Sequence, residues 1–182
     1  MGANDDVVEI GCGVGRLTRP LARRARSVVA LDVSPTMIER ARRLNPELAN
    51  VEWRAGDGTS LAPIPDGSAS ACVSHVVFQH IPDPGVTLGY VREMGRVSRP
   101  GGWAAFQVSN DPSVHAPPPM ARRARARAAA VLGRGPRGQD DPAWLGSHVE
   151  LDDLAAAAAD GGMRIERSSG RVPSSASSSR GA

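Results

Sequence analysis

Short apolar runs alternate with segments of helical periodicity along the first 110 residues of the chain. Runs of the kind that form buried strands lie at residues 7–10, 27–33, 51–54, 69–77 and 103–108. Between these runs, the spacing of apolar side chains predicts helices over 16–26 and 85–98. A third helix is predicted over 34–44, because Ser34-Pro35 is a favourable helix start and Asn45-Pro46 stops a helix. Strands that alternate with helices in this way indicate an α/β fold with a mostly parallel sheet and right-handed crossovers.

The pattern changes after Asn110. The next residues contain a run of three prolines and an arginine-rich helical stretch, which we interpret as an insertion or lid. A final helix is predicted over 149–159 and a sixth strand over 163–172, before a Ser-rich tail that is expected to be disordered. The predicted organisation is a core over 1–110, an insertion over 111–147, a helix and strand of the same domain over 148–173, and a tail over 174–182.

The basic side chains are all arginine, because the 22 basic residues include no lysine. This excludes mechanisms that need a catalytic or phosphate-binding lysine. A net charge of +3 and an aromatic content of 3% give little support for a nucleic-acid-binding surface. Cys12 and Cys72 are too few for a disulfide framework or a zinc site. For that reason we expect no metal site. No apolar run is long enough to span a bilayer, so we expect a cytoplasmic protein.

A glycine cluster follows the first predicted strand and precedes the first predicted helix. Its sequence is Glu9-Ile10-Gly11-Cys12-Gly13-Val14-Gly15-Arg16. Glycines in such a loop allow a sharp turn and the close approach of a ligand, and the helix N-terminus offers unpaired N–H groups. The dinucleotide fingerprint is G-x-G-x-x-G, whereas the third glycine here comes one residue early. Glu9 is also unfavourable beside a pyrophosphate but favourable near an amino group and a sulfonium, which indicates a different adenosyl ligand.

This acidic-x-Gly-x-Gly-x-Gly pattern resembles the first motif of the class I S-adenosylmethionine-dependent methyltransferases. Further segments resemble the later motifs of that family in the same order, at residues 28–32, 34–38, 56–58, 73–83 and 96–102. The resemblance covers roughly residues 5–172 and implies a Rossmann-like sheet of order 3-2-1-4-5-(7)-6 with S-adenosylmethionine as the cofactor. The family also has an N-terminal helical cap and a seventh strand, which we do not find in this sequence. The chain is therefore expected to be truncated at both ends.

The resemblance implies cofactor-binding residues along these motifs. Those expected in the glycine loop are Glu9, Gly11, Cys12, Gly13, Gly15 and Arg16. Asp32 is expected to bind both ribose hydroxyls, and Met37 to pack near the adenine. In Gly56-Asp57-Gly58, Asp57 is expected to accept a hydrogen bond from the adenine amino group, although a plain turn is the alternative. The remaining expected cofactor contacts are Val33 and Ser74.

Methyl transfer is an in-line displacement, for which the protein mainly supplies alignment. A base is needed only when the acceptor is a hydroxyl or a protonated amine. His75 and His80, after the fourth predicted strand, are the candidate catalytic bases, because an imidazole titrates near neutrality. The alternative is that both histidines only shape the pocket.

The insertion holds further candidates. His115 and His148 are interpreted as surface residues, and Trp144 either lines the acceptor pocket or anchors the insertion. The arginines at 122, 123, 125 and 127 are interpreted as a solvated helix face, and the alternative is that they bind an anionic acceptor or a phosphate-bearing lipid. The predicted function is methyl transfer from S-adenosylmethionine to an oxygen, nitrogen or carbon of a small-molecule acceptor, with no nucleic-acid partner. Two alternatives stay open: a non-catalytic S-adenosylmethionine-binding or subunit-like remnant, and, less favoured, an NAD-dependent oxidoreductase.

Overall fold

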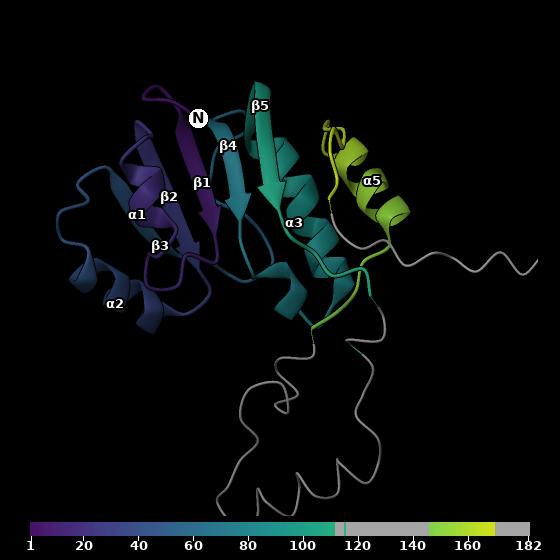
Figure 1. Cartoon of the computed structure of the whole chain (residues 1–182), viewed down its shortest axis with the longest axis horizontal. Helices are drawn as coiled ribbons and strands as arrows, with labels where there is room; N and C mark the ends of the chain where they lie inside the picture. The colour runs from purple at the N-terminus through teal and green to yellow at the C-terminus, as the bar shows by residue number, and fades with distance from the viewer. Residues whose placement is uncertain (112–114, 116–145, 170–182) are drawn as a thin grey trace, which may run out of the picture.

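The computed structural model describes residues 1–111, 115 and 146–169. Within this part of the chain, five parallel strands form one sheet (Figure 1). The strands are β1 (Asp6–Ile10), β2 (Ser27–Asp32), β3 (Val51–Ala55), β4 (Ala69–Ser74) and β5 (Ser98–Phe106). Their order is β3-β2-β1-β4-β5, which confirms the predicted α/β fold class and its 3-2-1-4-5 core. The strand order reverses between β1 and β4, which is where ligands bind in open sheets of this kind.

Helices cover both faces of the sheet. They are α1 (Thr18–Ala22), α2 (Pro35–Leu44), α3 (Pro84–Val97) and α5 (Leu151–Asp160), with a short 3-10 helix, η1 (Phe78–His80). Leu21 of α1 and Ile38 of α2 share a buried cluster with Val7 of β1. Met94 of α3 lies in a second buried cluster with Val8. Successive side chains of β1 therefore face two different cores, as expected for a central parallel strand.

The helix α2 begins where the sequence predicts. Ser34 is its N-cap, with an extended backbone and a side-chain oxygen that accepts from the Met37 N–H at 3.3 Å. Pro35 occupies the first helical position, where no N–H is needed. The helix ends at Leu44, directly before Asn45-Pro46, so both predicted boundaries are confirmed.

Two elements are shorter than predicted. The helix expected over 16–26 is confined to Thr18–Ala22. The chain turns at its end to enter β2, because the Arg26 N–H already donates to the Asp5 carbonyl at 2.8 Å. The fourth strand was expected to reach residue 77 but ends at Ser74, because Val76 has a φ of +59° that cannot continue a strand.

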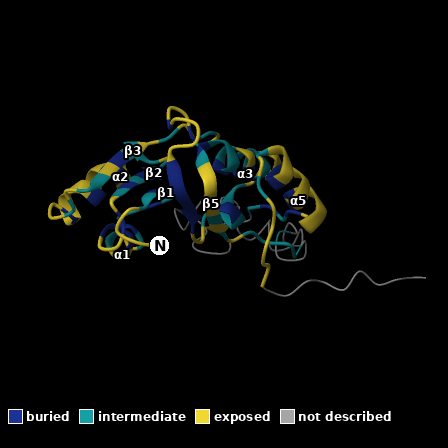
Figure 2. Cartoon of the chain, turned by 90° about the horizontal axis from the view of Figure 1, so that it is seen from above, coloured by how far each residue is buried: buried dark blue, intermediate teal, exposed yellow. Residues whose placement is uncertain are grey.

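The sheet ends at β5 within the described residues. The strand predicted over 163–172 does not form at 163–169: Met163 packs beside α3 and α5, and the next six residues are exposed. Within the described residues this stretch does not pair with β5, so Ile165 has no sheet or core to pack against and is exposed. The prediction is therefore wrong over 163–169. β5 starts earlier than the predicted residue 103, with a register shift opposite Ala69 and Ala71, and it is exposed along much of its length (Figure 2).

Several predictions lie outside the described residues. These are most of the insertion over 111–147, with its arginine cluster and Trp144, and the tail over 174–182. Among the helices that the structure does describe, none combines the length and the apolar character needed to cross a bilayer.

Candidate functional site

A cavity of about 460 Å³ lies at the carboxyl ends of the strands, in the size range of small-molecule sites. The end of β2 and the loop after β3 contribute Leu31, Asp32, Val33, Gly56, Gly58, Ser60 and Leu61. The end of β1, the segment after β4 and α3 contribute Ile10, Gly11, Val76, Val77, His80, Ile81, Pro82 and Tyr90. The walls are mainly apolar, with a few polar groups among them. Such a composition suits a flat, partly apolar ligand that is oriented by a few hydrogen bonds.

The glycine loop is fixed to the neighbouring strand. The N–H groups of Gly11 and Cys12 both donate to the Leu31 carbonyl at 2.8 Å. Gly11 has a φ of +75°, and a Cβ there would lie 2.2 Å from a methyl carbon of Val77. Only glycine therefore allows the end of β1 to pack against the segment that follows β4.

Asp32 joins the end of β2 to the glycine loop. One of its carboxylate oxygens accepts from the Gly13 N–H at 2.8 Å, and the other accepts from the Ser34 N–H at 2.9 Å. Each carboxylate oxygen has a second lone pair, so both can still accept from a ligand. Because Asp32 borders the cavity, these acceptors are available to a diol.

Glu9 is buried beneath the loop and does not border the cavity. Its carboxyl accepts from the Thr18 hydroxyl at 2.6 Å, which links β1 to α1. Burial raises the pKa of Glu9 to about 7, and the nearby charge of Asp32 adds to this shift. In this structure Glu9 therefore lies beneath the loop and does not reach the cavity.

Asp57 shapes its own loop. Its carboxylate accepts from the N–H groups of Thr59 and Ser60, both at 2.7 Å, and from the Ser60 hydroxyl at 2.6 Å. These hydrogen bonds, first that of the Ser60 hydroxyl, lower the pKa of Asp57 to about 2. The carboxylate is exposed and does not border the cavity, so its expected role toward an adenine ring stays a prediction.

The two candidate bases lie in different places. His80, at the end of η1, borders the cavity, and its Nε2 lies 3.4 Å from the Gln79 side-chain nitrogen. His75 is exposed and lies outside the lining. The Ser147 hydroxyl donates to the Ile81 carbonyl at 2.7 Å, so the chain returns to this rim after the insertion.

The structure brings together only part of the predicted set. Those that line the cavity are Gly11, Asp32, Val33, Gly56, Gly58 and His80. Those that do not are Glu9, Cys12, Gly13, Gly15, Arg16, Met37, Asp57, Ser74 and His75. Cys12 is buried, and burial raises the pKa of its thiol to about 12, while the Ser74 hydroxyl donates to the Ile10 carbonyl at 3.1 Å. These two side chains therefore support the loop from within the protein.

Sequence reasoning missed several lining residues. They are Ile10, Leu31, Ser60, Leu61, Val76, Val77, Ile81, Pro82 and Tyr90. Val76 has a positive φ, which is unfavourable for a β-branched residue and which no local sequence rule indicates. Tyr90 is the chain's single tyrosine, and a lone phenol on the apolar face of a predicted helix was the one signal available for it.

Comparison with known proteins identifies the family. The model of a family described as "Methyltransferase domain" matches residues 8–106, which is more than half of the chain. The chain belongs to the methyltransferase domain family. The match runs from β1 through β5 and so contains all the strands that carry the cavity.

Relatives of this methyltransferase domain include two methyltransferases of known name. The chain is 31% identical over 100 residues to demethylmenaquinone methyltransferase from Tropheryma whipplei, and the match covers 55% of this chain and 40% of the relative. It is 32% identical over 105 residues to ubiquinone biosynthesis O-methyltransferase from Xanthomonas campestris, covering 57% and 43%. The chain thus spans less than half the length of these two relatives.

Solved structures share the fold of this methyltransferase domain. An S-adenosylmethionine-dependent methyltransferase from Mesorhizobium loti is 26% identical, with a TM-score of 0.54, over 63% of this chain and 51% of that one. A putative sarcosine dimethylglycine methyltransferase from Galdieria sulphuraria is 21% identical, with a TM-score of 0.64, over 91% and 57%. The latter likeness is evidence for the fold alone.

The cofactor of this family is S-adenosylmethionine, and the residues present fit it. Asp32 presents a carboxylate at the rim, which matches the diol of a ribose. Gly13 has a φ of +53°, and a Cβ there would meet no atom within 4 Å, so the loop leaves open space on that side. Val33 is 66% exposed at the rim, which leaves an apolar side chain available to pack on a ring. A polar rim beside an apolar wall suits an adenosyl group.

Proposed function

We propose that this methyltransferase domain binds S-adenosylmethionine and transfers its methyl group to an oxygen, nitrogen or carbon atom of a small-molecule acceptor. The single observation that carries the proposal is the placement of Asp32. Its carboxylate is held by the N–H groups of Gly13 and Ser34 at the rim of a mainly apolar cavity. Family membership supplies the class of reaction.

The residues of the chain act mainly by binding and alignment. When bound, the cofactor supplies an activated methyl group on a sulfonium. Asp32 would accept from the two ribose hydroxyls, and the glycine loop would hold the methionine part. Val77, which packs against Gly11, and Ile81 line the cavity with apolar side chains. Holding the two reactants in line accounts for much of the acceleration expected of such an enzyme.

His80 is the base for acceptors that must lose a proton. It borders the cavity, whereas His75 is exposed and lies outside it. A neutral imidazole accepts a proton from a hydroxyl or an ammonium group close to neutral pH. We therefore assign catalysis to His80 and no catalytic role to His75.

The same cavity supports a proposal for the class of acceptor. Its mainly apolar walls favour a small, partly apolar molecule over a charged polymer. The named relatives act in ubiquinone biosynthesis or on demethylmenaquinone, which supports an aromatic or quinol-like acceptor. Since the chain spans less than half of those relatives, this acceptor class is a proposal for the domain described here.

The test is methyl transfer from S-adenosylmethionine labelled in its methyl group to a panel of acceptors. The panel contains a quinol, a simple phenol, a primary amine and a carbon acid. We expect label in at least one acceptor, and loss of this labelling in Asp32→Ala. Binding of S-adenosylhomocysteine without transfer to any acceptor would favour the non-catalytic alternative. A protein that neither binds S-adenosylhomocysteine nor transfers label to any acceptor would overturn the proposal.

A further inference from the structure

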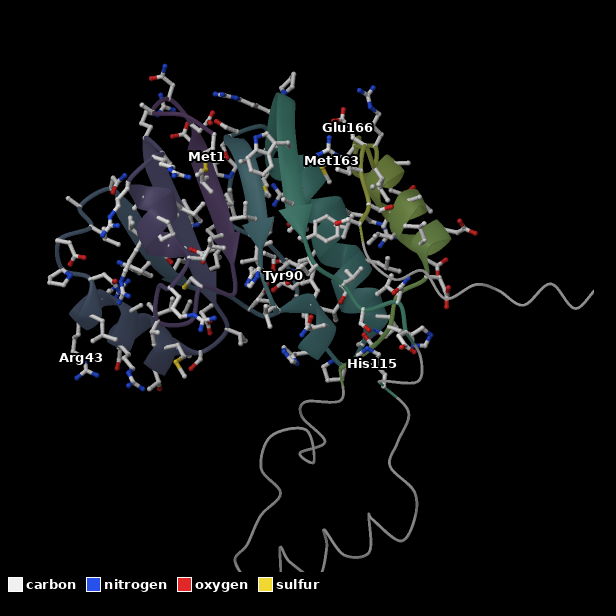
Figure 3. The ribbon with its side chains drawn as sticks, viewed as in Figure 1. Met1, Arg43, Tyr90, His115, Met163 and Glu166 are labelled. Atoms are coloured by element: carbon white, nitrogen blue, oxygen red, sulfur yellow. The ribbon has the colours of Figure 1, made fainter. Side chains whose placement is uncertain are left out.

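Tyr90 on α3 is almost fully buried and borders the cavity, with 7% of its surface exposed. Figure 3 labels it near the carboxyl end of β4, on the side of α3. Within the described part of the chain no hydrogen bond to its hydroxyl is found, and its oxygen is not among the fully buried polar atoms that lack a partner. The hydroxyl therefore opens toward the cavity that the ring borders, where a ligand can replace water as its hydrogen-bond partner.

The ring of Tyr90 is held rigidly. It stacks on Phe78 of η1, with centroids 5.6 Å apart and an interplanar angle of 22°. Phe78 is itself buried and contacts Phe106 of β5 at 5.7 Å between centroids. A phenol fixed in this way presents its oxygen at a defined place, so a hydrogen bond to a ligand costs little conformational entropy.

Tyr90 also lies at the loop after β3. Leu61 of that loop donates its N–H at 3.1 Å to Glu93, which is one helical turn after Tyr90. The negative charge of Asp57 in the same loop contributes, after burial, to raising the pKa of Tyr90 to about 12. The hydroxyl is therefore neutral at physiological pH. A neutral phenol hydroxyl can accept as well as donate a hydrogen bond, so its oxygen can accept from a ligand.

The same loop is tied to the ribose-binding position. The Gly56 N–H donates to the Asp32 carbonyl at 3.0 Å, so the loop begins beside the proposed ribose site. In any adenosyl ligand the base is bonded directly to the ribose. A ribose at Asp32 therefore directs the base along the cavity wall formed by Gly56, Gly58 and Leu61, toward Tyr90.

We propose that the Tyr90 oxygen accepts a hydrogen bond from the 6-amino group of the cofactor's adenine and so selects adenine over other bases. This inference rests on the proposed function, since it concerns the same cofactor. It adds a specificity-determining residue on α3. The motifs of the sequence place the hydrogen-bonding recognition of the base in the loop around Asp57, with Met37 expected to pack near the ring.

The experiment compares two ligands and three proteins by calorimetry. The ligands are S-adenosylhomocysteine and its analogue in which hydrogen replaces the 6-amino group. We expect Tyr90→Phe to bind S-adenosylhomocysteine about tenfold more weakly than wild type, and the analogue with unchanged affinity. The matched control is Ser98→Ala, which removes a hydroxyl at the far end of α3 where it donates to the Met94 carbonyl. Its affinity for both ligands should equal that of wild type.

A second measurement needs no variant. Because the chain has a single tyrosine, labelling the tyrosine Cζ with carbon-13 gives one resonance. We expect this resonance to shift on addition of S-adenosylhomocysteine and to shift much less with the 6-hydrogen analogue. Equal shifts, or equal affinities of Tyr90→Phe and wild type for S-adenosylhomocysteine, would overturn the inference. A raised acceptor KM with unchanged cofactor affinity would also overturn it. If wild type binds neither ligand, it is the proposed function that fails.

Discussion

The carboxylate of Asp32 accepts a 2.8 Å hydrogen bond from the backbone N–H of Gly13, which joins the end of β2 to the loop that follows β1. The same side chain borders the cavity, so it both holds the loop and faces the ligand. Asp32→Ala removes the acceptors for Gly13, Ser34 and the ribose together. We expect at least a tenfold loss of S-adenosylhomocysteine affinity, or about 1.4 kcal/mol, in a calorimetric titration. Glu39→Ala, an exposed acid on α2, is the control and should bind like wild type.

Both the backbone conformation at position 11 and the neighbouring Val77 side chain restrict that position to glycine. The φ of Gly11 is +75°, and a Cβ would lie 2.2 Å from Val77, whereas Gly67 has a similar φ of +62° and no atom within 4 Å. Alanine at Gly67 should therefore cost about 1 kcal/mol from backbone strain alone. Alanine at Gly11 should cost roughly 2 kcal/mol more because of overpacking. Urea unfolding of both variants measures the difference, and equal free energies of unfolding would show that Val77 moves aside freely.

Glu9 makes the free energy of unfolding depend on pH. Burial raises its pKa to about 7 from an ordinary 4.5, so the folded state holds a proton that the unfolded state releases between these values. The unfolded state then binds fewer protons, and stability falls as pH rises from about 4.5 to about 7, by roughly 3 kcal/mol at most. Above that range both states are ionised and the effect is constant.

Glu9→Gln removes this ionisation while keeping the shape of the side chain and its link to Thr18. We expect the stability of the variant relative to wild type to rise between pH 5 and pH 7 and to stay level above pH 8. Urea unfolding at these pH values gives the comparison. A relative stability that does not change with pH would contradict the raised pKa of Glu9.

Asn45 ties α2 to the glycine loop and to α1. It is 2% exposed, and its amide nitrogen donates to the carbonyls of Ala41 at 2.6 Å and Val14 at 3.1 Å. Its oxygen accepts from the Arg19 guanidinium. Asn45→Ala should lower the free energy of unfolding by roughly 2–3 kcal/mol, because buried partners lose their hydrogen bonds. Asn4→Ala, at an exposed position, should change it by less than about 0.5 kcal/mol in the same thermal or urea experiment.

The sequence predicts the elements whose rules are local. Ser34-Pro35 is a complete helix start in itself, and the glycine spacing after Ile10 defines both a turn and a type of ligand. The parallel core follows from the alternation of strands and helices. Asp32 is predicted from its place at the end of the second strand, about 20 residues after the glycine loop, and the structure brings it against that loop.

The remaining features depend on tertiary packing. Tyr90 borders the cavity because α3 packs it with Leu61 of the loop after β3 and with Phe78 of the segment after β4. Glu9 looks like a ligand-facing acid in the sequence, but it lies beneath the loop and bonds to Thr18. The strand expected from residue 163 fails because apolar periodicity does not show whether a partner strand or a core is available.

The most direct test of the account is a calorimetric titration of S-adenosylhomocysteine, and separately of NADH, into the purified chain. The account predicts one binding site per chain for S-adenosylhomocysteine, with a Kd below about 100 μM, and no binding of NADH. The chain must be shown to be folded by circular dichroism in the same buffer. A folded chain that binds NADH, or that gives no heat with S-adenosylhomocysteine at any temperature tried, would contradict the central claim.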